Sequence, residues 1–276
     1  MRISVLASGS GGNAVLVEER DTKVLIDCGV SLRQLQRRVH AVGATLEGLA
    51  AVLLTHEHTD HVQGVAVLRR HVAAPVIATP GTAEALAGLG GVEPGLVAGR
   101  SLRVGSLHFV PVATSHDARE PVGFVIESAA GRVALVTDTG ELPGELTRTL
   151  AGCRALLLET NHDPDLLRYG RYPWPLKQRI ASATGHLSNV QARGAIEALC
   201  HEGLEIVVAM HLSQENNRPE LARREIERPL AGSAVRVAVA SQFEPLVIEV
   251  GERRGRPGQG RLFDEDSVTA RETRRA

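Results

Sequence analysis

The sequence predicts an α/β fold in which β-sheets are sandwiched between layers of helices. Short runs rich in β-branched residues dominate the first half of the chain and are typical of antiparallel strands that follow one another. From Leu142 onward, segments with helical periodicity alternate with further apolar runs. Sheets placed between helical layers are the economical way to bury both kinds of segment.

The expected elements follow from these patterns in order. The clearest helix begins at Ser31, a favourable N-cap, and ends at Gly43, with Leu35 and Val39 on its apolar face. A second helix is expected at residues 62–71 and a third at 190–201. Strands are expected at residues 3–6, 14–17, 24–27, 51–55, 107–112, 122–127, 133–137, 155–158 and 206–210.

The chain is long enough for one large domain followed by a tail. It has 276 residues, of which 43% are hydrophobic, so residues 1–250 can enclose a substantial core. Residues 253–261 hold four arginines, three glycines and a proline but no acid. We therefore expect residues 251–276 to be a disordered, Arg-rich tail, either simply solvated or in contact with a nucleic-acid backbone.

Charge and cysteine usage limit the partners and the compartment. The net charge of −1 provides no overall basic field, so contact with nucleic acid requires a local basic patch. Three cysteines at unpaired spacings argue against a disulfide framework and favour the reducing cytoplasm. The N-terminus is too short for a signal peptide, and no apolar run reaches 18 residues, so we expect no membrane association.

The segment 55–61 places His56, His58, Asp60 and His61 directly after an apolar run. Imidazole and carboxylate ligands suit zinc or manganese, which lower the pKa of bound water to about 7 and so create a nucleophile. A polar loop whose histidines cap a helix is the alternative, but four potential ligands at this spacing favour metal-dependent hydrolysis. Because side chains of an extended chain repeat every two residues, His56 and His58 can share one ion. Asp60 and His61, on the first turn of the next helix, can then face a second ion.

Three further candidate ligands follow other strands of the chain. His116, Asp138 and His211 each come shortly after an apolar strand. By their chemistry, His116 would complete the ion held by His56 and His58, His211 would complete the other ion, and Asp138 could bridge the two. Each residue taken alone is as easily a turn or cap residue, so the set as a whole carries the prediction.

This ligand series resembles the five-motif signature of the metallo-β-lactamase superfamily. The resemblance spans residues 3–250 and implies a four-layered αβ/βα sandwich with a dinuclear site at the open edge between its sheets. The resemblance also implies the same seven metal ligands that were assigned above from their chemistry. The order of the later motifs is similar to that of the tRNase Z nucleases, and closer still to the WalJ (YycJ) family of bacterial exonucleases. The residues that carry this closer resemblance lie at 6–13, 115–118, 159–163, 172–173, 176–177, 185–189 and 211–217. It implies a manganese- or zinc-dependent nuclease that digests DNA from the 5′ end, with a role in mismatch repair.

A basic and aromatic stretch at residues 167–179 independently suggests a nucleic-acid substrate. It contains both tyrosines and the only tryptophan of the chain, interleaved with four basic residues. Such a mixture stacks bases and neutralises phosphates, although a proline-rich surface turn could also gather these residues. We expect Tyr172, Trp174, Lys177 and Arg179 to contact single-stranded DNA or a DNA end.

The remaining candidates surround the expected metal site. His186 precedes a helix N-terminus, where an anion is favoured, and is expected to contact the scissile phosphate or protonate the leaving oxygen. His162 is expected to orient His186 or to line the pocket. Either histidine could instead be a cap or loop residue, which is the simpler interpretation for His162. Further substrate contacts are expected from the glycine-rich turn and the start of the helix after His186 (Ser8, Asn13, Ser188, Asn189).

The predicted function is hydrolysis of a phosphodiester by two bridged divalent ions. Asp60 orients the nucleophile and His186 or water supplies the proton to the departing oxygen. Three alternatives stay open: an RNA-processing nuclease or cyclic phosphodiesterase of the same fold, a lactone or thioester hydrolase, and a nucleic-acid-binding module with inactive metal sites.

Overall fold

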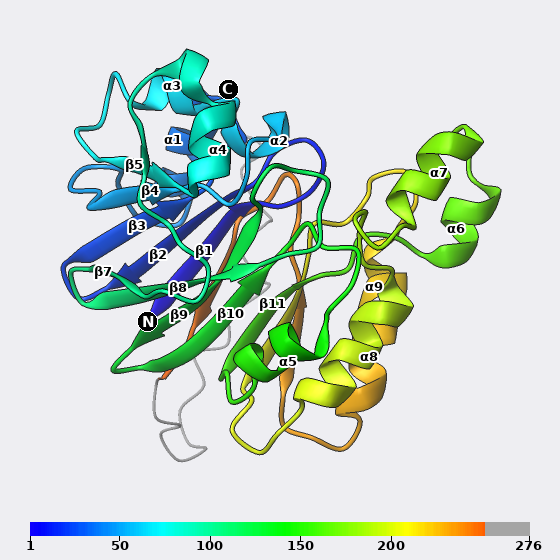
Figure 1. Ribbon diagram of the computed structural model, residues 1–276. Coiled ribbons are helices and arrows are strands. Elements are labelled where there is room, and N and C mark those ends of the chain that lie inside the picture. Colours follow the sequence, from blue (N-terminus) through cyan, green and yellow to red (C-terminus); the bar gives the residue numbers. More distant parts are fainter. Residues whose placement is uncertain (252–276) are drawn as a thin grey trace, which may run out of the picture.

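The computed structural model describes residues 1–251 and confirms the predicted four-layered sandwich (Figure 1). Two seven-stranded sheets pack face to face, and helices cover the outer face of each. The tail predicted at residues 251–276 lies outside the described residues except for Gly251. None of the helices within residues 1–251 combines the length and apolar character that crossing a bilayer requires.

The first sheet combines an antiparallel half with a parallel half. Strands β14, β1, β2 and β3 pair antiparallel, whereas β3, β4, β5 and β6 pair parallel. In spatial order the strands are β14 (Leu246–Glu249), β1 (Arg2–Ala7), β2 (Ala14–Glu19), β3 (Thr22–Ile26), β4 (Ala51–Leu53), β5 (Val76–Ala78) and β6 (Val92–Pro94).

The second sheet repeats this arrangement. Strands β7 to β10 pair antiparallel, and β10 to β13 pair parallel. In spatial order they are β13 (Arg236–Val239), β12 (Ile206–Met210), β11 (Ala155–Glu159), β10 (Gly131–Val136), β9 (Val122–Ser128), β8 (Leu107–Ala113) and β7 (Leu102–Val104). Because the parallel strands of a sheet point the same way, their carboxyl ends gather at one edge, where ligands bind in open α/β sheets.

Alternating side chains divide the core into three apolar layers. Ile3 and Val5 of β1 face the other sheet, where Phe109 and Phe124 meet edge to face at 6.1 Å. Helices α1 (Leu32–Ala41), α2 (Thr59–Val62), α3 (Val65–Leu68) and α4 (Pro80–Ala85) cover the first sheet. Helices α5 (Gly144–Leu150), α8 (Asn189–Leu199) and α9 (Pro219–Glu227) cover the second. Short 3-10 turns lie at Ala87–Leu89 and Arg228–Leu230.

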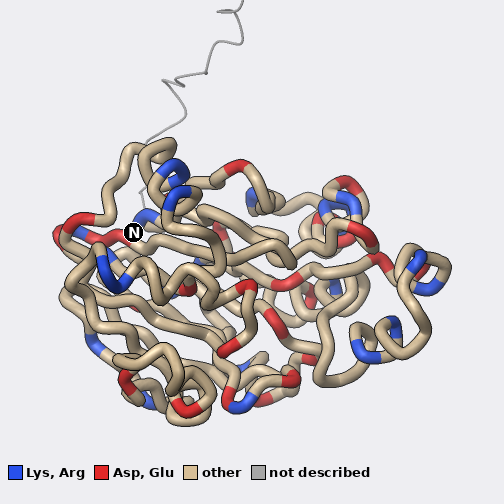
Figure 2. The backbone as a smooth tube through the Cα atoms, turned by 90° about the horizontal axis from the view of Figure 1, so that it is seen from above, with Lys and Arg blue, Asp and Glu red and all other residues tan. Residues whose placement is uncertain are grey.

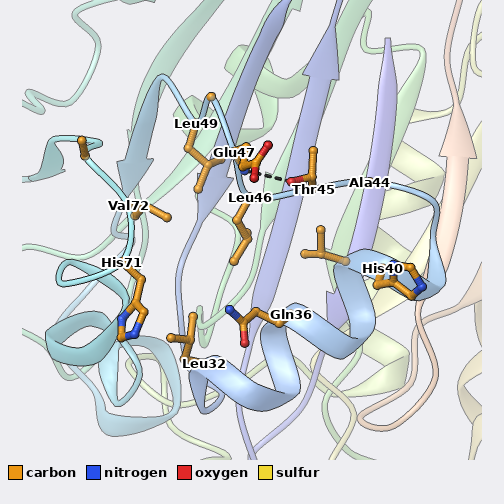
Figure 3. Close-up of a pocket in the computed structure, with 13 residues that line it drawn as sticks. Leu32, Gln36, His40, Ala44, Thr45, Leu46, Glu47, Leu49, His71 and Val72 are labelled. Atoms are coloured by element: carbon orange, nitrogen blue, oxygen red, sulfur yellow. Dashed lines mark hydrogen bonds between the residues drawn. The ribbon is translucent and has the colours of Figure 1, made fainter.

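Helix α1 illustrates how closely local signals set the boundaries. Ser31 caps its first turn in a reciprocal capping box with Gln34, and Gly43 ends it with a φ of +70°. A hollow of about 630 Å³ lies beneath this helix, between it and residues 44–49 (Figure 3). Its lining includes His40 and His71, but neither belongs to a group of potential metal ligands within residues 1–251.

The prediction of one continuous helix at residues 62–71 is wrong. That helix is replaced by two four-residue helices, α2 and α3, which meet at Gly64. The N–H of Gly64 donates to the carbonyl of Cys28, while the carbonyl of Asp60 accepts from the N–H of Asn13. A Cβ at Gly64 would lie 2.2 Å from the carbonyl oxygen of Val30. The break thus lets the chain pack against residues 28–30 and turns Asp60 and His61 toward the sheet edge.

Two short helices stand out from the body of the sandwich, α6 (Pro164–Tyr169) and α7 (Trp174–Ile180). They lie between β11 and α8 in the chain, and Figure 2 shows Lys and Arg recurring along them. We call residues 164–180 the arm. Neither helix was predicted, since each is shorter than two full turns and lacks a sustained apolar face.

Candidate metal centre and active site

The seven predicted ligands lie together at the edge where strands of both sheets end. His56 and His58 follow β4, His116 follows β8, Asp138 follows β10 and His211 follows β12, whereas Asp60 and His61 lie on α2. Their potential ligand atoms form groups whose members all lie within 4.8 Å of one another: His56, His58 and His116; Asp60, His61 and His211; and His56, His61 and Asp138.

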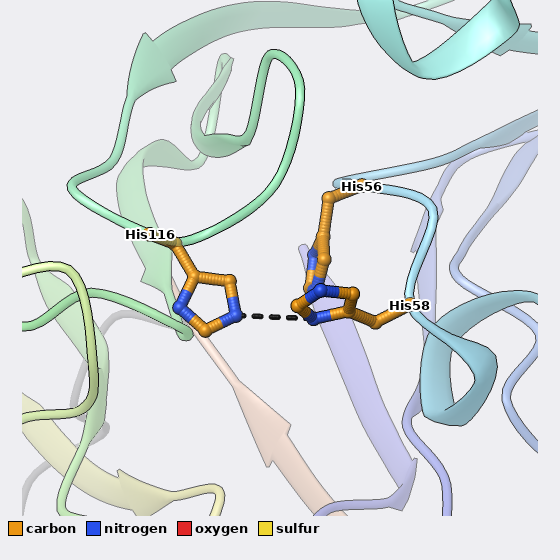
Figure 4. A group of neighbouring side chains, drawn as sticks. All are labelled: His56, His58 and His116. Carbon is orange, nitrogen blue, oxygen red and sulfur yellow. Dashed lines mark hydrogen bonds between the residues drawn. The ribbon is translucent and has the colours of Figure 1, made fainter. Parts of the chain in front are cut away.

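The first group has the arrangement expected from alternation along an extended chain. His56 and His58 project to the same side and meet His116 from the other sheet, with His116 Nε2 3.2 Å from His58 Nδ1 (Figure 4). Glu57 points the other way, where its carboxylate accepts from the N–H of Arg119 and the hydroxyl of Thr82. The intervening acid therefore stabilises neighbouring loops and does not join the ligand group.

Asp138 occupies the centre of the cluster. Its Oδ2 lies 3.2 Å from His61 Nε2 and 3.2 Å from His211 Nδ1, and its Oδ1 lies 3.8 Å from His116 Nε2. Burial by itself raises the pKa of a carboxyl group, but His211 and His61 outweigh it and hold the pKa of Asp138 well below its usual range. This position fits the bridging role predicted for it.

Unpartnered polar atoms show that the cluster fits divalent ions. His56 Nε2, Asp138 Oδ2 and His211 Nδ1 are buried and have no hydrogen-bond partner among the described residues. The 3.2 Å approach of His211 to Asp138 lacks hydrogen-bonding geometry, so these two atoms converge without satisfying each other. A buried polar atom left without a partner costs about 1–3 kcal/mol, and an ion that accepts several lone pairs removes that cost.

The backbone turns that aim these side chains are strained. Asp27 and His211 follow a strand directly and Asp138 follows one after a single residue, and the three adopt a positive φ of 59° (Asp27), 57° (Asp138) and 53° (His211). Left-handed backbone is uncommon outside glycine and concentrates at functional sites. It lets one residue leave the strand and turn its side chain into the gap between the sheets.

Asp27 orients ligands of both groups, and no prediction included it. Its Oδ2 accepts from His61 Nδ1 at 2.7 Å and from the hydroxyl of Thr55 at 2.9 Å. The same hydroxyl lies 3.0 Å from His56 Nδ1. Carboxylates that bind the outer nitrogen of a metal-binding histidine fix which nitrogen is free for the ion. Asp27 follows a strand, and this is the sequence signal that led to Asp138, so the same signal could have identified Asp27.

Beside the cluster, His186 pairs with Glu159, the last residue of β11. His186 Nδ1 lies 2.7 Å from Glu159 Oε1, and the fully buried carboxylate also accepts from the N–H groups of Thr139 and Leu187 through Oε2. Burial lowers the pKa of His186, but the charges of Glu159 and Asp138 outweigh it and raise the pKa to about 9. Asp138, Glu159, His186 and His211 form a further group of possible ligands. Since both oxygens of Glu159 are engaged, this pair is better suited to moving a proton.

A cavity of about 410 Å³ opens onto these groups. His58, Asp60, His116, Asp138, His186 and His211 line it together with Ser10 and Asn161. The arm supplies one wall through Tyr172, Leu176, Arg179 and Ile180. At its rim, Arg179 Nε lies 2.5 Å from Asp117 Oδ2.

The predicted substrate contacts divide into those that reach the cavity and those that do not. Tyr172 and Arg179 line it, and Trp174 stands outside on the arm with 65% of its surface exposed. The side chain of Lys177 is held within the arm, because its Nζ donates hydrogen bonds to the carbonyls of Arg168 and Gly170. The arm residues thus point in two directions, toward the cavity and toward solvent.

The other predicted contacts have partners within the fold. The hydroxyl of Ser8 accepts from the N–H of His211, and the amide of Asn13 contacts His61 and Asp60. Ser188 caps α8, and Asn189 exchanges amide hydrogen bonds with Asn217. His162 is buried away from the cavity lining, and burial lowers its pKa to about 4. As substrate contacts, all five remain predictions.

Comparisons with known proteins agree with this geometry. Residues 22–212 match the family model described as beta-lactamase superfamily domain. The exodeoxyribonuclease YycJ of Bacillus anthracis is 34% identical over 235 residues, covering 83% of this chain and 89% of that protein. The exodeoxyribonuclease WalJ of Streptococcus pneumoniae is 34% identical over 245 residues, covering 86% and 91%. Zinc-bound PqqB from Methylobacterium extorquens superposes with a TM-score of 0.70 at 18% identity, covering 91% of this chain and all of that chain, and this similarity concerns the fold alone.

Proposed function

Because this chain belongs to the beta-lactamase superfamily, and within it to the family of the WalJ/YycJ exodeoxyribonucleases, we propose that it hydrolyses DNA from the 5′ end using two divalent ions. The observation that supports this most strongly is the meeting of two ligand groups and the His186–Glu159 pair at one cavity. A hydrolase of this kind needs a place for charge neutralisation and a proton donor on the same side of the substrate.

Each ion has a set of donors in this proposal. In this proposal His56, His58 and His116 would hold one ion, Asp60, His61 and His211 would hold the other, and Asp138 would be available to either. Mixed imidazole and carboxylate donors suit zinc and manganese equally. When bound, such ions neutralise phosphate charge and supply hydroxide near neutral pH.

The remaining chemistry falls to side chains of the cavity. Asp60, a quarter exposed at the cavity, accepts a hydrogen bond from the attacking water and orients it toward phosphorus. Glu159 holds His186 by Nδ1, so that Nε2 is the nitrogen that donates a proton to the departing oxygen. Arg179, released from Asp117 at the rim, is placed to contact a phosphate oxygen.

The free cysteines and the direction of digestion bear on the cellular context. All three cysteines are free, which supports the cytoplasm as the compartment. An exonuclease that begins at a 5′ end would remove a nicked strand that carries a mismatch, and we therefore assign the activity to DNA repair.

Replacing Asp60 tests the proposed chemistry directly. Asp60→Ala should lose metal-dependent cleavage of a labelled DNA strand by at least about 100-fold, because it removes a ligand and the group that orients water. Asp21→Asn, in the exposed β2–β3 turn, is the control and should cleave normally. Full activity in Asp60→Ala would refute the scheme.

A further inference from the structure

The arm also has an outer face, by which we mean its exposed arginine and aromatic residues that do not line the cavity, namely Arg168, Tyr169, Arg171 and Trp174. Only Leu167 among residues 164–180 is buried, and the arm projects from the sandwich (Figure 1). Tyr169 is 76% exposed and Trp174 is 65% exposed. Large aromatic side chains that stay in water do not gain the free energy of burial. Two exposed ones on one short arm therefore indicate a surface that binds a partner.

Two exposed arginines, Arg168 and Arg171, lie on this outer face. The side chains of Arg168 and Arg171 form no ion pair or hydrogen bond with any residue of the described part of the chain. Arg168 instead lies over the ring of Tyr169, 5.5 Å from its centroid. The arm contains four basic residues and one acid, Asp165. The outer face thus presents two exposed aromatic rings and two guanidinium groups that have no ion-pair partner among the described residues.

Helix α7 connects this outer face to the catalytic cavity. The same helix that begins at Trp174 reaches the cavity with Leu176, Arg179 and Ile180. At 1.5 Å per residue, Trp174 stands about 8 Å along the helix axis from Arg179. A strand whose phosphate occupies the cavity would therefore meet the aromatic face within a short distance.

We infer that the outer face of the arm binds single-stranded DNA that continues from the scissile phosphate, an inference that rests on the proposed nuclease function. Bases stack on Tyr169 and Trp174, and Arg168 and Arg171 neutralise the adjoining phosphates. Stacking on aromatic rings tolerates any base, which suits an enzyme that digests a strand regardless of sequence. Lys177 takes no part, since its two hydrogen bonds to backbone carbonyls hold α6 to α7.

Intrinsic fluorescence provides a direct test, because Trp174 is the only tryptophan of the chain. Titration of the full-length protein with an oligothymidylate, in the presence of a chelator that prevents cleavage, should quench this fluorescence to saturation. By anisotropy of a labelled strand, Tyr169→Ala and Trp174→Ala should each bind roughly 5- to 150-fold more weakly. Tyr169→Phe should bind normally, since stacking needs the ring and not the hydroxyl.

Salt dependence tests the arginines separately. The double variant Arg168→Ala/Arg171→Ala should lower the slope of log affinity against log salt by about 1.4, as expected for two lost phosphate contacts on a single strand. The matched controls are Phe243→Ala, an aromatic 63% exposed outside the arm, and Arg33→Ala/Arg148→Ala on the exposed faces of α1 and α5. Both should bind DNA as the wild type does.

Three results would overturn the inference. The first is unchanged tryptophan fluorescence at a saturating concentration of the DNA strand. The second is wild-type affinity for DNA in both Tyr169→Ala and Trp174→Ala. The third is a dimer, seen by light scattering, that Trp174→Ala dissociates without any loss of DNA binding. Hydrolysis of bis(p-nitrophenyl) phosphate by the metal-loaded protein tests the nuclease proposal independently of the arm, because this small phosphodiester carries no DNA strand. Tyr169→Ala and Arg168→Ala/Arg171→Ala, which change no residue of the cavity lining, should retain that activity. A wild type inactive on this substrate and on DNA would refute the nuclease, and the binding titration would then decide on the arm alone.

Discussion

Replacing Asp27 by Asn should weaken the binding of both ions without removing any ligand. Asp27 is 3% exposed, and its Oδ1 accepts from the N–H of Thr55 at 2.8 Å. Its Oδ2 fixes the proton of His61 on Nδ1, and through the Thr55 hydroxyl it does the same for His56. In each histidine this leaves Nε2 as the atom available to an ion.

The geometry gives an asparagine no satisfactory orientation. If its oxygen keeps the bond to the Thr55 N–H, its NH₂ group faces His61 Nδ1, and His61 must carry its proton on Nε2. If the amide flips, two donors face each other at Thr55, at a cost of about 1–3 kcal/mol. Loss of such an outer partner typically lowers metal affinity about 10- to 100-fold, which corresponds to about 1.4–2.7 kcal/mol.

Competition with a chromophoric zinc chelator measures this affinity for each ion. Asp21→Asn is the matched control, because it removes the same charge at the opposite, exposed end of β3. Circular dichroism should show the same secondary structure in all three proteins. Wild-type affinity for both ions in Asp27→Asn would refute the orienting role of this carboxylate.

Three other outcomes can be measured on the same preparation. Stripping both proposed ions should lower the melting temperature by roughly 10–20 °C, because each ion at about 100 times its Kd contributes about 2.7 kcal/mol, or about 5.4 kcal/mol for the two; equal melting with and without chelator would contradict this. Glu159→Gln should reduce kcat on DNA by about 100- to 10,000-fold with normal metal content, because His186 loses the carboxylate that holds it; an unchanged kcat would exclude the pair from proton transfer. Ser188→Ala should lower the free energy of unfolding in urea by about 1 kcal/mol, since it breaks the capping box with Gln191, and no loss would show that the cap is dispensable.

The sequence predicted nine of the fourteen strands of residues 1–251 and the gathering of the ligands, because both depend on local patterns. It missed β5, β6, β7, β13 and β14, which have only three or four residues each. The apolar runs predicted strand ends at residues 55, 112, 137 and 210, and the strands end within two residues of these positions. Parallel strands of one sheet must also end at one edge. The split of the helix at Gly64 was not predictable in this way. It depends on the contact of Gly64 with residues 28–30, which are far away in the sequence.

The roles of individual polar residues were also beyond local reasoning. Lys177 and Arg179 look equivalent in the sequence, yet one clamps the arm internally and the other reaches the cavity and Asp117. Glu159 follows the same strand-end pattern as Asp138, but its pairing with His186 arises only when β11 and the start of α8 come together. Tertiary packing determines which buried polar groups form hydrogen bonds with one another, and the periodicity of the sequence carries no information about it.

The most direct measurement follows the fate of labelled ends. A single-stranded DNA labelled at its 5′ or 3′ terminus, and an RNA of the same sequence, are incubated with the protein and manganese or zinc. We predict that the 5′ label is released at once in mononucleotides or very short products, that the 3′-labelled DNA shortens progressively, and that Asp60→Ala and chelator abolish both. Cleavage of RNA but not DNA, or shortening from the 3′ end, would contradict the proposed 5′→3′ DNA exonuclease.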